Sequence, residues 1–192
     1  MNALPSNVRK QVINTLKKIS VLKYGQFKLK NGSISSVYID LRILPNFPKE
    51  FQKIIKISAD FIQKNEKIGF FDAIIAPPLA GVPLGVAIAL ELKKEFYLAR
   101  LQIKNHGTRK LIEGNVQNKR ILMVDDVITS GGSKIPLLES IRSHGAKIDS
   151  VFVFINRMPD KNSLDAFEQD NNVSLSFLLS LNDLLNSTEI DV

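Results

Sequence analysis

The sequence predicts an α/β fold in which helices flank a mostly parallel sheet. Short apolar runs, typical of buried strands, lie at residues 72–76, 96–101, 120–124 and 150–155. Helical patterns lie between two pairs of these runs, at residues 83–93 and 133–144. Continuous apolar strands separated by helices are characteristic of a parallel sheet covered on both faces. At 192 residues, with 44% hydrophobic and 23% charged residues, the chain is expected to form one folded domain, residues 1–192.

The regions before and after this alternation have patterns of their own. Ser6 is expected to cap a helix whose apolar positions recur at helical spacing up to Ile19. Residues 27–42 alternate around Asn31 and Gly32, a pair that suits a tight hairpin turn. A helix is expected to begin at Pro48. Near the end, residues 173–177 predict a strand and residues 181–185 a short helix, both read as structural.

Composition excludes several classes of site. The chain has no cysteine, so a disulfide framework, a thiolate nucleophile and thiolate-bound zinc or iron are excluded, and His106 and His144 are too few for a histidine-rich metal site. The formal charge of +7 favours anionic partners. Nucleic acid is an unlikely one, because no recognisable nucleic-acid-binding motif is present. Without a long apolar run, no membrane association is expected, and a cytoplasmic location is the default.

The candidate chemistry lies where the third apolar run ends. Residues 121–124 are apolar, Asp125 and Asp126 follow, and the small residues 129–133 (Thr-Ser-Gly-Gly-Ser) come just before a helix. Main-chain amides of such a loop, together with the helix N-terminus, suit a phosphate group. The adjacent carboxylates suit ribose hydroxyls or hydrated Mg²⁺. The alternative is an ordinary polar loop, which the combined order of strand, acid pair, loop and helix makes the weaker interpretation.

This segment resembles the signature of type I phosphoribosyltransferases, which bind 5-phosphoribosyl 1-diphosphate. Three further segments resemble the orotate phosphoribosyltransferase family within that class: residues 24–42, the polar stretch around residues 100–114, and Arg157 just after the strand that ends at Ile155. The likeness spans about residues 20–160. It implies the type I phosphoribosyltransferase fold, with a small hood over the core formed by about residues 1–45, which include the hairpin, and by the C-terminal segment.

The resemblance also implies a reaction and its residues. Orotate N1 would displace diphosphate from the ribose to give orotidine 5′-monophosphate, with Mg²⁺ held mainly by the substrate diphosphate and through water by Asp125. The implied catalytic residues are Arg100, Lys104, His106 and Asp126, and the implied orotate contacts are Lys30, Tyr38, Thr129 and Arg157. The implied contacts with 5-phosphoribosyl 1-diphosphate are Leu79, Ala80, Arg100, Lys104, His106, Asp125, Asp126, Val127, Ile128, Thr129, Ser130, Gly131, Gly132 and Ser133.

Residues 102–119 form a polar stretch longer than an ordinary connection, and we interpret it as a lid with Gly107 and Gly114 as hinges. By resemblance, the lid reaches the neighbouring site of a homodimer. Without the resemblance, Lys104 would be a solvated loop lysine, Arg157 a surface charge and Tyr38 an equally good core residue. The loop at residues 76–81 resembles the family's diphosphate loop, which often contains a cis peptide.

Two departures from the family pattern keep other functions open. Many relatives carry lysine where this chain has Ala80, and another lysine near Leu101 and Gln102. Each absence removes positive charge from a site for a polyphosphate. A paralogue of low activity, a regulator that senses the phosphoribosyl donor, and a transferase for another nucleobase are therefore the alternatives to orotate phosphoribosyl transfer.

Overall fold

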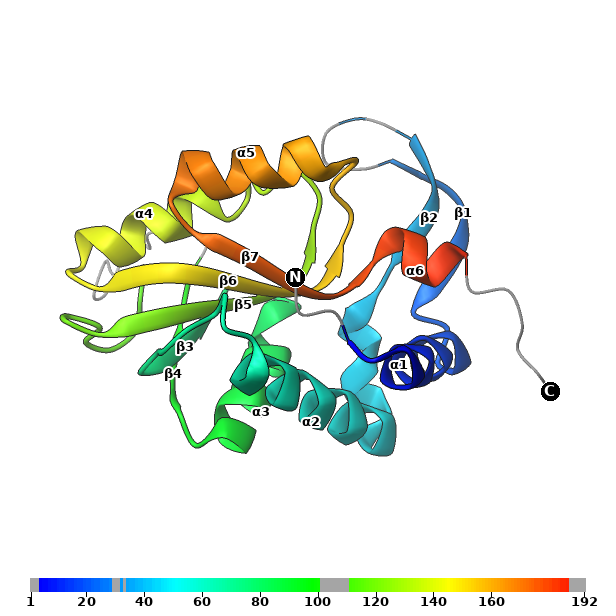
Figure 1. The fold of residues 1–192 in the computed structure, drawn as a ribbon, viewed down its shortest axis with the longest axis horizontal. Helices are drawn as coiled ribbons and strands as arrows, with labels where there is room; N and C mark the ends of the chain where they lie inside the picture. The colour runs from blue at the N-terminus through cyan, green and yellow to red at the C-terminus, as the bar shows by residue number, and fades with distance from the viewer. Residues whose placement is uncertain (1–3, 29–31, 33, 101–110, 187–192) are drawn as a thin grey trace.

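The computed structural model describes residues 4–28, 32, 34–100 and 111–186, and its centre is a parallel sheet (Figure 1). The sheet has five strands in the order β4-β3-β5-β6-β7, and every neighbouring pair is parallel. The strands are β3 (Ala73–Ala76), β4 (Glu95–Leu98), β5 (Arg120–Ile128), β6 (Lys147–Asn156) and β7 (Ser174–Ser180). The predicted α/β class and parallel sheet are confirmed.

Helices cover both faces of the sheet. In Figure 1, α2 (Pro48–Lys64) and α3 (Gly81–Leu92) lie below it, and α4 (Ile135–Ser143) and α5 (Lys161–Asn171) lie above it. None of the helices in the described ranges is long and apolar enough to cross a bilayer. Strand β6 shows why both faces need cover, because its apolar residues alternate between two cores. Phe152 and Phe154 face the α2 and α3 side, whereas Val151 and Val153 face α4 and α5.

The remaining elements lie together at one end of the sheet, to the right in Figure 1. They are α1 (Ser6–Lys18), β1 (Leu22–Lys28), β2 (Ile34–Ile39), a 3₁₀ helix η1 (Leu41–Asn46) and α6 (Leu181–Leu185). Strands β1 and β2 pair antiparallel, as the alternating pattern predicts, with a register shift between Tyr24 and Phe27. The hairpin therefore lies near the ends of β6 and β7, where site residues are expected.

Several predicted boundaries differ from the structure. Strand β5 continues past Val124 to Ile128, because Asp125 and Val127 keep their pairing with β6. The twin aspartates therefore lie inside the strand rather than beyond it. Ser6 is the first residue of α1 and not its cap, and the carbonyl oxygen of Pro5 accepts the first helical bond, from Arg9 N. Helix α4 begins two residues later than predicted, at Ile135.

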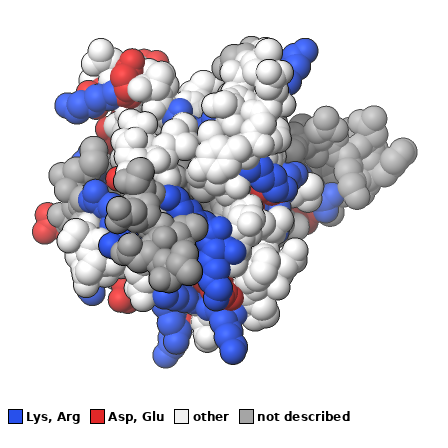
Figure 2. All heavy atoms as spheres, turned by 90° about the vertical axis from the view of Figure 1, so that its right-hand side faces the viewer, with Lys and Arg blue, Asp and Glu red and all other residues white. Residues whose placement is uncertain are grey.

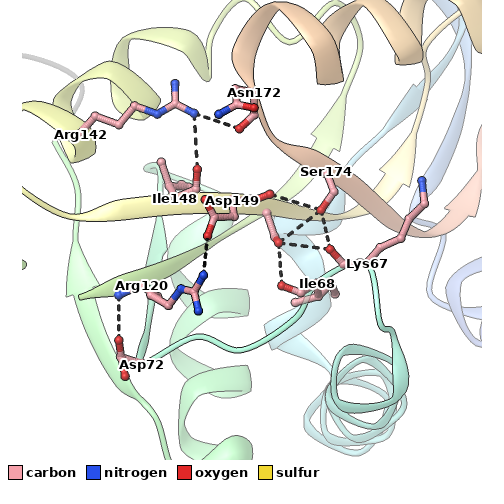
Figure 3. Close-up of polar contacts among 10 residues, drawn as sticks. Lys67, Ile68, Asp72, Arg120, Arg142, Ile148, Asp149, Asn172 and Ser174 are labelled. Atoms are coloured by element: carbon pink, nitrogen blue, oxygen red, sulfur yellow. Dashed lines mark hydrogen bonds and ion pairs between the residues drawn. The ribbon is translucent and has the colours of Figure 1, made fainter. Parts of the chain in front are cut away.

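Side chains tie together the loops at the amino ends of the strands (Figure 3). Ser174 Oγ donates to the carbonyl oxygen of Lys67 at 2.6 Å, and Arg142 donates to that of Asn171 at 2.6 Å. Asp72 and Arg120 exchange two hydrogen bonds of 2.8 Å, which join the starts of β3 and β5. The carbonyl groups of Lys67, Asn171 and Arg120 and the amides of Asp72 and Arg120, which lie at or beside the ends of regular elements, are thus satisfied. The candidate site lies at the opposite edge of the sheet, where the strands have their carboxyl ends.

Candidate functional site

The strand order creates a crevice at the carboxyl edge. After β3 the chain moves outward to β4, and it then returns to place β5 on the other side of β3. Ligands of open α/β sheets bind at such a switch point, outside the carboxyl ends of the strands. The loops that follow β3 and β5 flank it, and these are the two loops that the sequence singles out as anion-binding.

The loop after β3 approaches strand β5 closely at Gly81. A Cβ atom on Gly81 would lie 2.9 Å from Asp125 Oδ1 and 3.2 Å from the Val124 carbonyl oxygen. Any side chain at position 81 would therefore push this loop away from β5. The first loop contains a cis peptide bond between Pro78 and Leu79, as the resemblance implies. Leu79 is 81% exposed and Ala80 precedes α3 directly. Residues 77–81 therefore form a surface beside the aspartates.

Main-chain amides hold the twin aspartates in place. Asp126 N donates to Asp125 Oδ1 at 2.8 Å, and Val127 N donates to Asp126 Oδ1 at 2.7 Å. Burial, and then the neighbouring Asp125 carboxylate, raise the pKa of Asp126 to about 7. Val127 N is occupied by this bond. A carboxylate that accepts one bond still has room for hydroxyl groups.

Sequence reasoning missed Lys134. Its side chain is 3% exposed, and Nζ lies 2.7 Å from Asp125 Oδ2 and donates to the Val127 carbonyl oxygen at 3.0 Å. From the local sequence alone, a lysine at the start of a predicted helix is interpreted as a surface charge. The only local signal was its place directly after the phosphate-type loop.

The loop at residues 129–133 has the shape expected of an anion cradle. Thr129, Ser130, Gly132 and Ser133 are exposed, and α4 begins two residues after the loop. Gly131 is buried with φ +79°, and a Cβ there would lie 2.3 Å from two atoms of the Phe167 ring. Glycine is thus required at position 131 both by conformation and by space.

Arg157 connects the central sheet to the hairpin. Its main-chain N donates to the Ile128 carbonyl oxygen at 2.8 Å, and its guanidinium donates to Ser35 Oγ on β2 at 3.1 Å. Partial burial lowers the pKa of its guanidinium relative to a free arginine. Arg157 therefore stands beside the end of β5, facing the hairpin, as a carboxylate-binding group would need to.

The 3₁₀ helix η1, directly after the hairpin, carries another cationic group that was not singled out, Arg42. Arg42 contacts the Asp40 carboxylate at 2.6 Å and donates to Tyr38 Oη at 3.1 Å, and Lys23 pairs with the same Asp40 at 3.0 Å. The Arg42 hydrogen bond is the main cause of the lowered pKa of Asp40. The hydrogen bond with Asp40 is the main cause of the raised pKa of Arg42. The charge of Asp126 also raises it, so Arg42 interacts electrostatically with Asp126. Tyr38 is half-buried with its ring 5.4 Å from that of Phe27.

The ends of the expected lid are anchored. Ala99 and Ile112 form an antiparallel bridge, and Arg100 forms an ion pair with Glu113. Ile112 and Val116 are buried in the core that faces α4 and α5. Within the second half of the predicted lid, residues 111–119, Ile112 and Val116 are therefore held against the core, and the lid itself stays a prediction. Lys30, Lys104 and His106 lie outside the described residues, as do Gly107, Leu101 and Gln102.

Positive charge also gathers away from this edge. Figure 2 shows Lys and Arg side chains in the middle and lower part of the face that carries α1. A hollow of about 620 Å³ lies between α1 and α2 and is lined by Lys10, Lys18, Lys49 and Lys53, with Glu50 paired to Lys18. The net charge of +7 is thus not concentrated at the candidate site.

Comparison with known proteins identifies the family. Residues 42–176 match the phosphoribosyl transferase domain. The chain is 37% identical, over 154 residues, to the orotate phosphoribosyltransferase of Pyrococcus horikoshii, a match that covers 78% of this chain and 80% of that protein. The chain belongs to the orotate phosphoribosyltransferase family.

Solved structures agree with this assignment. The crystal structure of orotate phosphoribosyltransferase from Aeropyrum pernix superposes with a TM-score of 0.77 at 28% identity, covering 91% of this chain and 96% of that one. UMP synthase of Leishmania donovani matches with a TM-score of 0.79 at 25% identity, covering 95% of this chain and 38% of that longer chain. The orotate phosphoribosyltransferase fold therefore extends over the whole described sheet, its helices and the hairpin.

Proposed function

We propose that this protein transfers the phosphoribosyl group of 5-phosphoribosyl 1-diphosphate to orotate, giving orotidine 5′-monophosphate and diphosphate for pyrimidine synthesis. The observation that carries the proposal is the close approach of the loop at residues 77–81 to Asp125, on the strand that leads into the loop at residues 129–133, with Arg157 bonded to the end of that strand. The phosphoribosyl donor and the nucleotide product are both phosphorylated metabolites. The proposed location of the protein is the cytoplasm. Residues 1–45 and the C-terminal segment are proposed to form a hood within one domain, residues 1–192.

Each end of the donor has a proposed partner. The 5′-phosphate binds the loop at residues 129–133 and the start of α4, where amides and a helix dipole favour an anion. The ribose hydroxyls bind the twin aspartates. The diphosphate binds the loop at residues 77–81 and Arg100, with Lys104 and His106 supplied from the lid of the other subunit. Arg157 binds the orotate carboxylate through its planar fork, and Lys30, Tyr38 and Thr129 complete the base site.

In the proposed reaction, orotate N1 gives up its proton to solvent and bonds to ribose C1, while the bond from C1 to the diphosphate oxygen breaks and diphosphate leaves with the electron pair. The protein's part is to align these atoms and to neutralise the charge that grows on the leaving group. The described residues include no cluster of three or more acidic or histidine side chains suited to a metal. The oxygens of Asp125 and Asp126 do suit the water shell of a Mg²⁺ that takes its other ligands from diphosphate. When bound, Mg²⁺ would offset the diphosphate charge.

The activity can be tested directly. Purified protein is mixed with orotate, 5-phosphoribosyl 1-diphosphate and Mg²⁺, and the decrease in orotate absorbance is followed. Absorbance that persists with folded protein would overturn the proposal. Turnover of uracil, hypoxanthine or adenine instead would identify another nucleobase transferase, and donor binding without turnover would favour the regulatory alternative.

Arg157 provides the sharpest test of the orotate site. Arg157→Ala is expected to raise the KM for orotate roughly 10- to 100-fold, because a hydrogen-bonded charged group contributes about 1.5–3 kcal/mol. Arg157→Lys keeps the charge but loses the fork, and an intermediate KM is expected. The KM for the phosphoribosyl donor should stay within about threefold of wild type in both.

Arg120→Ala is the matched control, because Arg120 lies at the amino edge of the same sheet and pairs only with groups there. It should change neither KM. Steady-state kinetics with each substrate varied in turn distinguish these outcomes. An unchanged orotate KM in Arg157→Ala would remove Arg157 from the site.

A homodimer is proposed through α3 and the edge strand β4. Helix α3 is apolar on its outward side as well as its buried side: Val82, Val86 and Ala87 are half-buried and Leu90 is 74% exposed. Leu98 on the neighbouring β4 is also exposed, and β4 is the edge strand of the five-stranded sheet in the described residues. A helix apolar all round is typical of a buried position. A second copy of the chain is the occupant that the proposed lid exchange requires.

Leu90→Asp is expected to convert the dimer to a monomer and to reduce activity at least about tenfold, because a charge would be buried at the interface. Light scattering after size-exclusion chromatography measures the mass. Tyr24→Asp changes an equally exposed side chain on β1 (70% exposed) and should leave the mass unchanged. A Leu90→Asp protein that remains dimeric would exclude this face as the interface.

A further inference from the structure

The buried ammonium group of Lys134 lies between the two anion-binding loops. Lys134 directly follows the loop at residues 129–133 and precedes α4, yet its side chain turns inward and is 3% exposed. Nζ contacts two acceptors on β5, namely Asp125 Oδ2 at 2.7 Å and the Val127 carbonyl oxygen at 3.0 Å. A lysine so buried needs its acceptors, since an unpaired charge away from water is strongly unfavourable.

These contacts close the phosphate-type loop on itself. Val127 lies just before the loop and Lys134 just after it, so the Nζ bond to the Val127 carbonyl joins the two ends of the loop. Inside the loop, Lys134 N donates to the Gly131 carbonyl oxygen at 2.8 Å. Lys134 therefore fixes both the width of the loop and its angle to β5.

Asp125 extends this connection to the other loop. Its Oδ2 is held by Lys134, while its Oδ1 accepts from Asp126 N and lies against Gly81, where a Cβ would be 2.9 Å away. Gly81 is the last residue of the proposed diphosphate loop. The carboxylate of Asp125 thus lies between Gly81 of the first loop and Lys134 at the end of the second, and the ammonium of Lys134 fixes its position.

We propose that Lys134 is a positioning residue that sets the distance between the two anion-binding loops, so that a ligand reaching both loops is favoured over ligands that reach only one. The proposal rests on the proposed function, because it takes the phosphoribosyl donor as the ligand that spans the loops. Lys134 itself does not contact the ligand. Its effect is transmitted through Asp125 and Val127, and its removal should therefore weaken binding selectively.

Calorimetric titration with three ligands, each with Mg²⁺, tests this. They are 5-phosphoribosyl 1-diphosphate, which spans both loops, ribose 5-phosphate, which has only the 5′-phosphate, and inorganic diphosphate. In Lys134→Met, the Kd for the spanning ligand is expected to rise roughly 10- to 100-fold, whereas the Kd of each shorter ligand changes less than about threefold. Lys134→Arg retains a cation with donors for both acceptors and should restore most of the spanning affinity.

Lys94→Met is the matched control. Lys94 also donates to a main-chain carbonyl, that of Phe71 at 2.8 Å, but it lies between α3 and β4, at the amino edge. It should alter none of the three affinities. If Lys134→Met does not fold, Lys134→Gln, which keeps an amide NH₂ group but no charge, is titrated in its place. The same selective rise in the Kd of the spanning ligand is expected.

Three results would be decisive. Selective loss of the spanning ligand supports the proposal. Equal loss of all three ligands, or no loss of any, overturns it, because either result shows that Lys134 does not set the distance between the loops. Wild-type protein that binds none of the three would instead refute the proposed function.

Discussion

Gly131→Ala is expected to destabilise the protein by roughly 2 to 5 kcal/mol, the combined cost of left-handed backbone for a non-glycine residue and of an overpacked core. Gly131 has φ +79°, and a methyl group there would lie 2.3 Å from two atoms of the Phe167 ring. Phe167 is buried on α5, so it has little room to move away. The loop must then distort, and we expect binding of the phosphoribosyl donor to be lost with it.

Urea unfolding followed by circular dichroism measures the change, and calorimetry measures donor binding. Gly132→Ala is the control within the same loop, because a Cβ there would meet only Ser130 Oγ, at 3.8 Å. Its unfolding free energy should stay within about 0.5 kcal/mol of wild type. Equal stability of the two variants would mean that Phe167 yields and that the loop is not held as the structure describes.

Asp126→Asn is expected to stabilise the ligand-free protein above pH 7 while it reduces activity. Burial and Asp125 raise the pKa of Asp126 from 3.8 to about 7 in the folded state. The folded protein therefore binds this proton more tightly than the unfolded chain, and the contribution of Asp126 to stability falls as pH rises from about 4 to 7. Above pH 7 the charged carboxylate costs up to about 4 kcal/mol, which asparagine avoids. Catalysis suffers because the charge that faces the ribose is gone.

The test is the unfolding free energy of wild type and Asp126→Asn, without ligand, between pH 5 and pH 8. The advantage of the variant should be greatest at pH 8 and should shrink as pH falls. Asp160→Asn is a control of opposite sign, since hydrogen bonds from Ser163 lower the pKa of Asp160 at the start of α5. That variant should be less stable than wild type at neutral pH. A pH-independent difference for Asp126→Asn would contradict the raised pKa.

Local patterns predicted the parts of the site that local interactions form. The apolar run before Asp125, the glycine pair and the following helix belong to one continuous segment, and the structure has them in that order. The hairpin was equally readable from its alternation. The extent of β5 was not, because Asp125 and Asp126 interrupt its apolar run, and residues 125–128 are held in the strand by pairing with β6, which is distant in sequence.

Burial of charged side chains was the main feature that the sequence did not reveal. Lys134 looks like a surface residue in sequence, and only tertiary packing buries it against Asp125. Asp40 is likewise buried, beside the exposed Arg42. The contact between Arg157 and Ser35 joins residues 122 positions apart. Lys30, Lys104 and His106 lie outside the described residues, so their roles stay predictions from the family resemblance.

The cross-tied amino edge of the sheet has a consequence for how the molecule can change. Ser174, Arg142 and Asp72 lock the starts of the strands, while every group proposed for catalysis that the structure describes stands at the opposite ends. Stabilising substitutions at the amino edge would therefore leave the proposed catalytic groups untouched. At the carboxyl edge, by contrast, Gly131 and Asp126 link stability to activity.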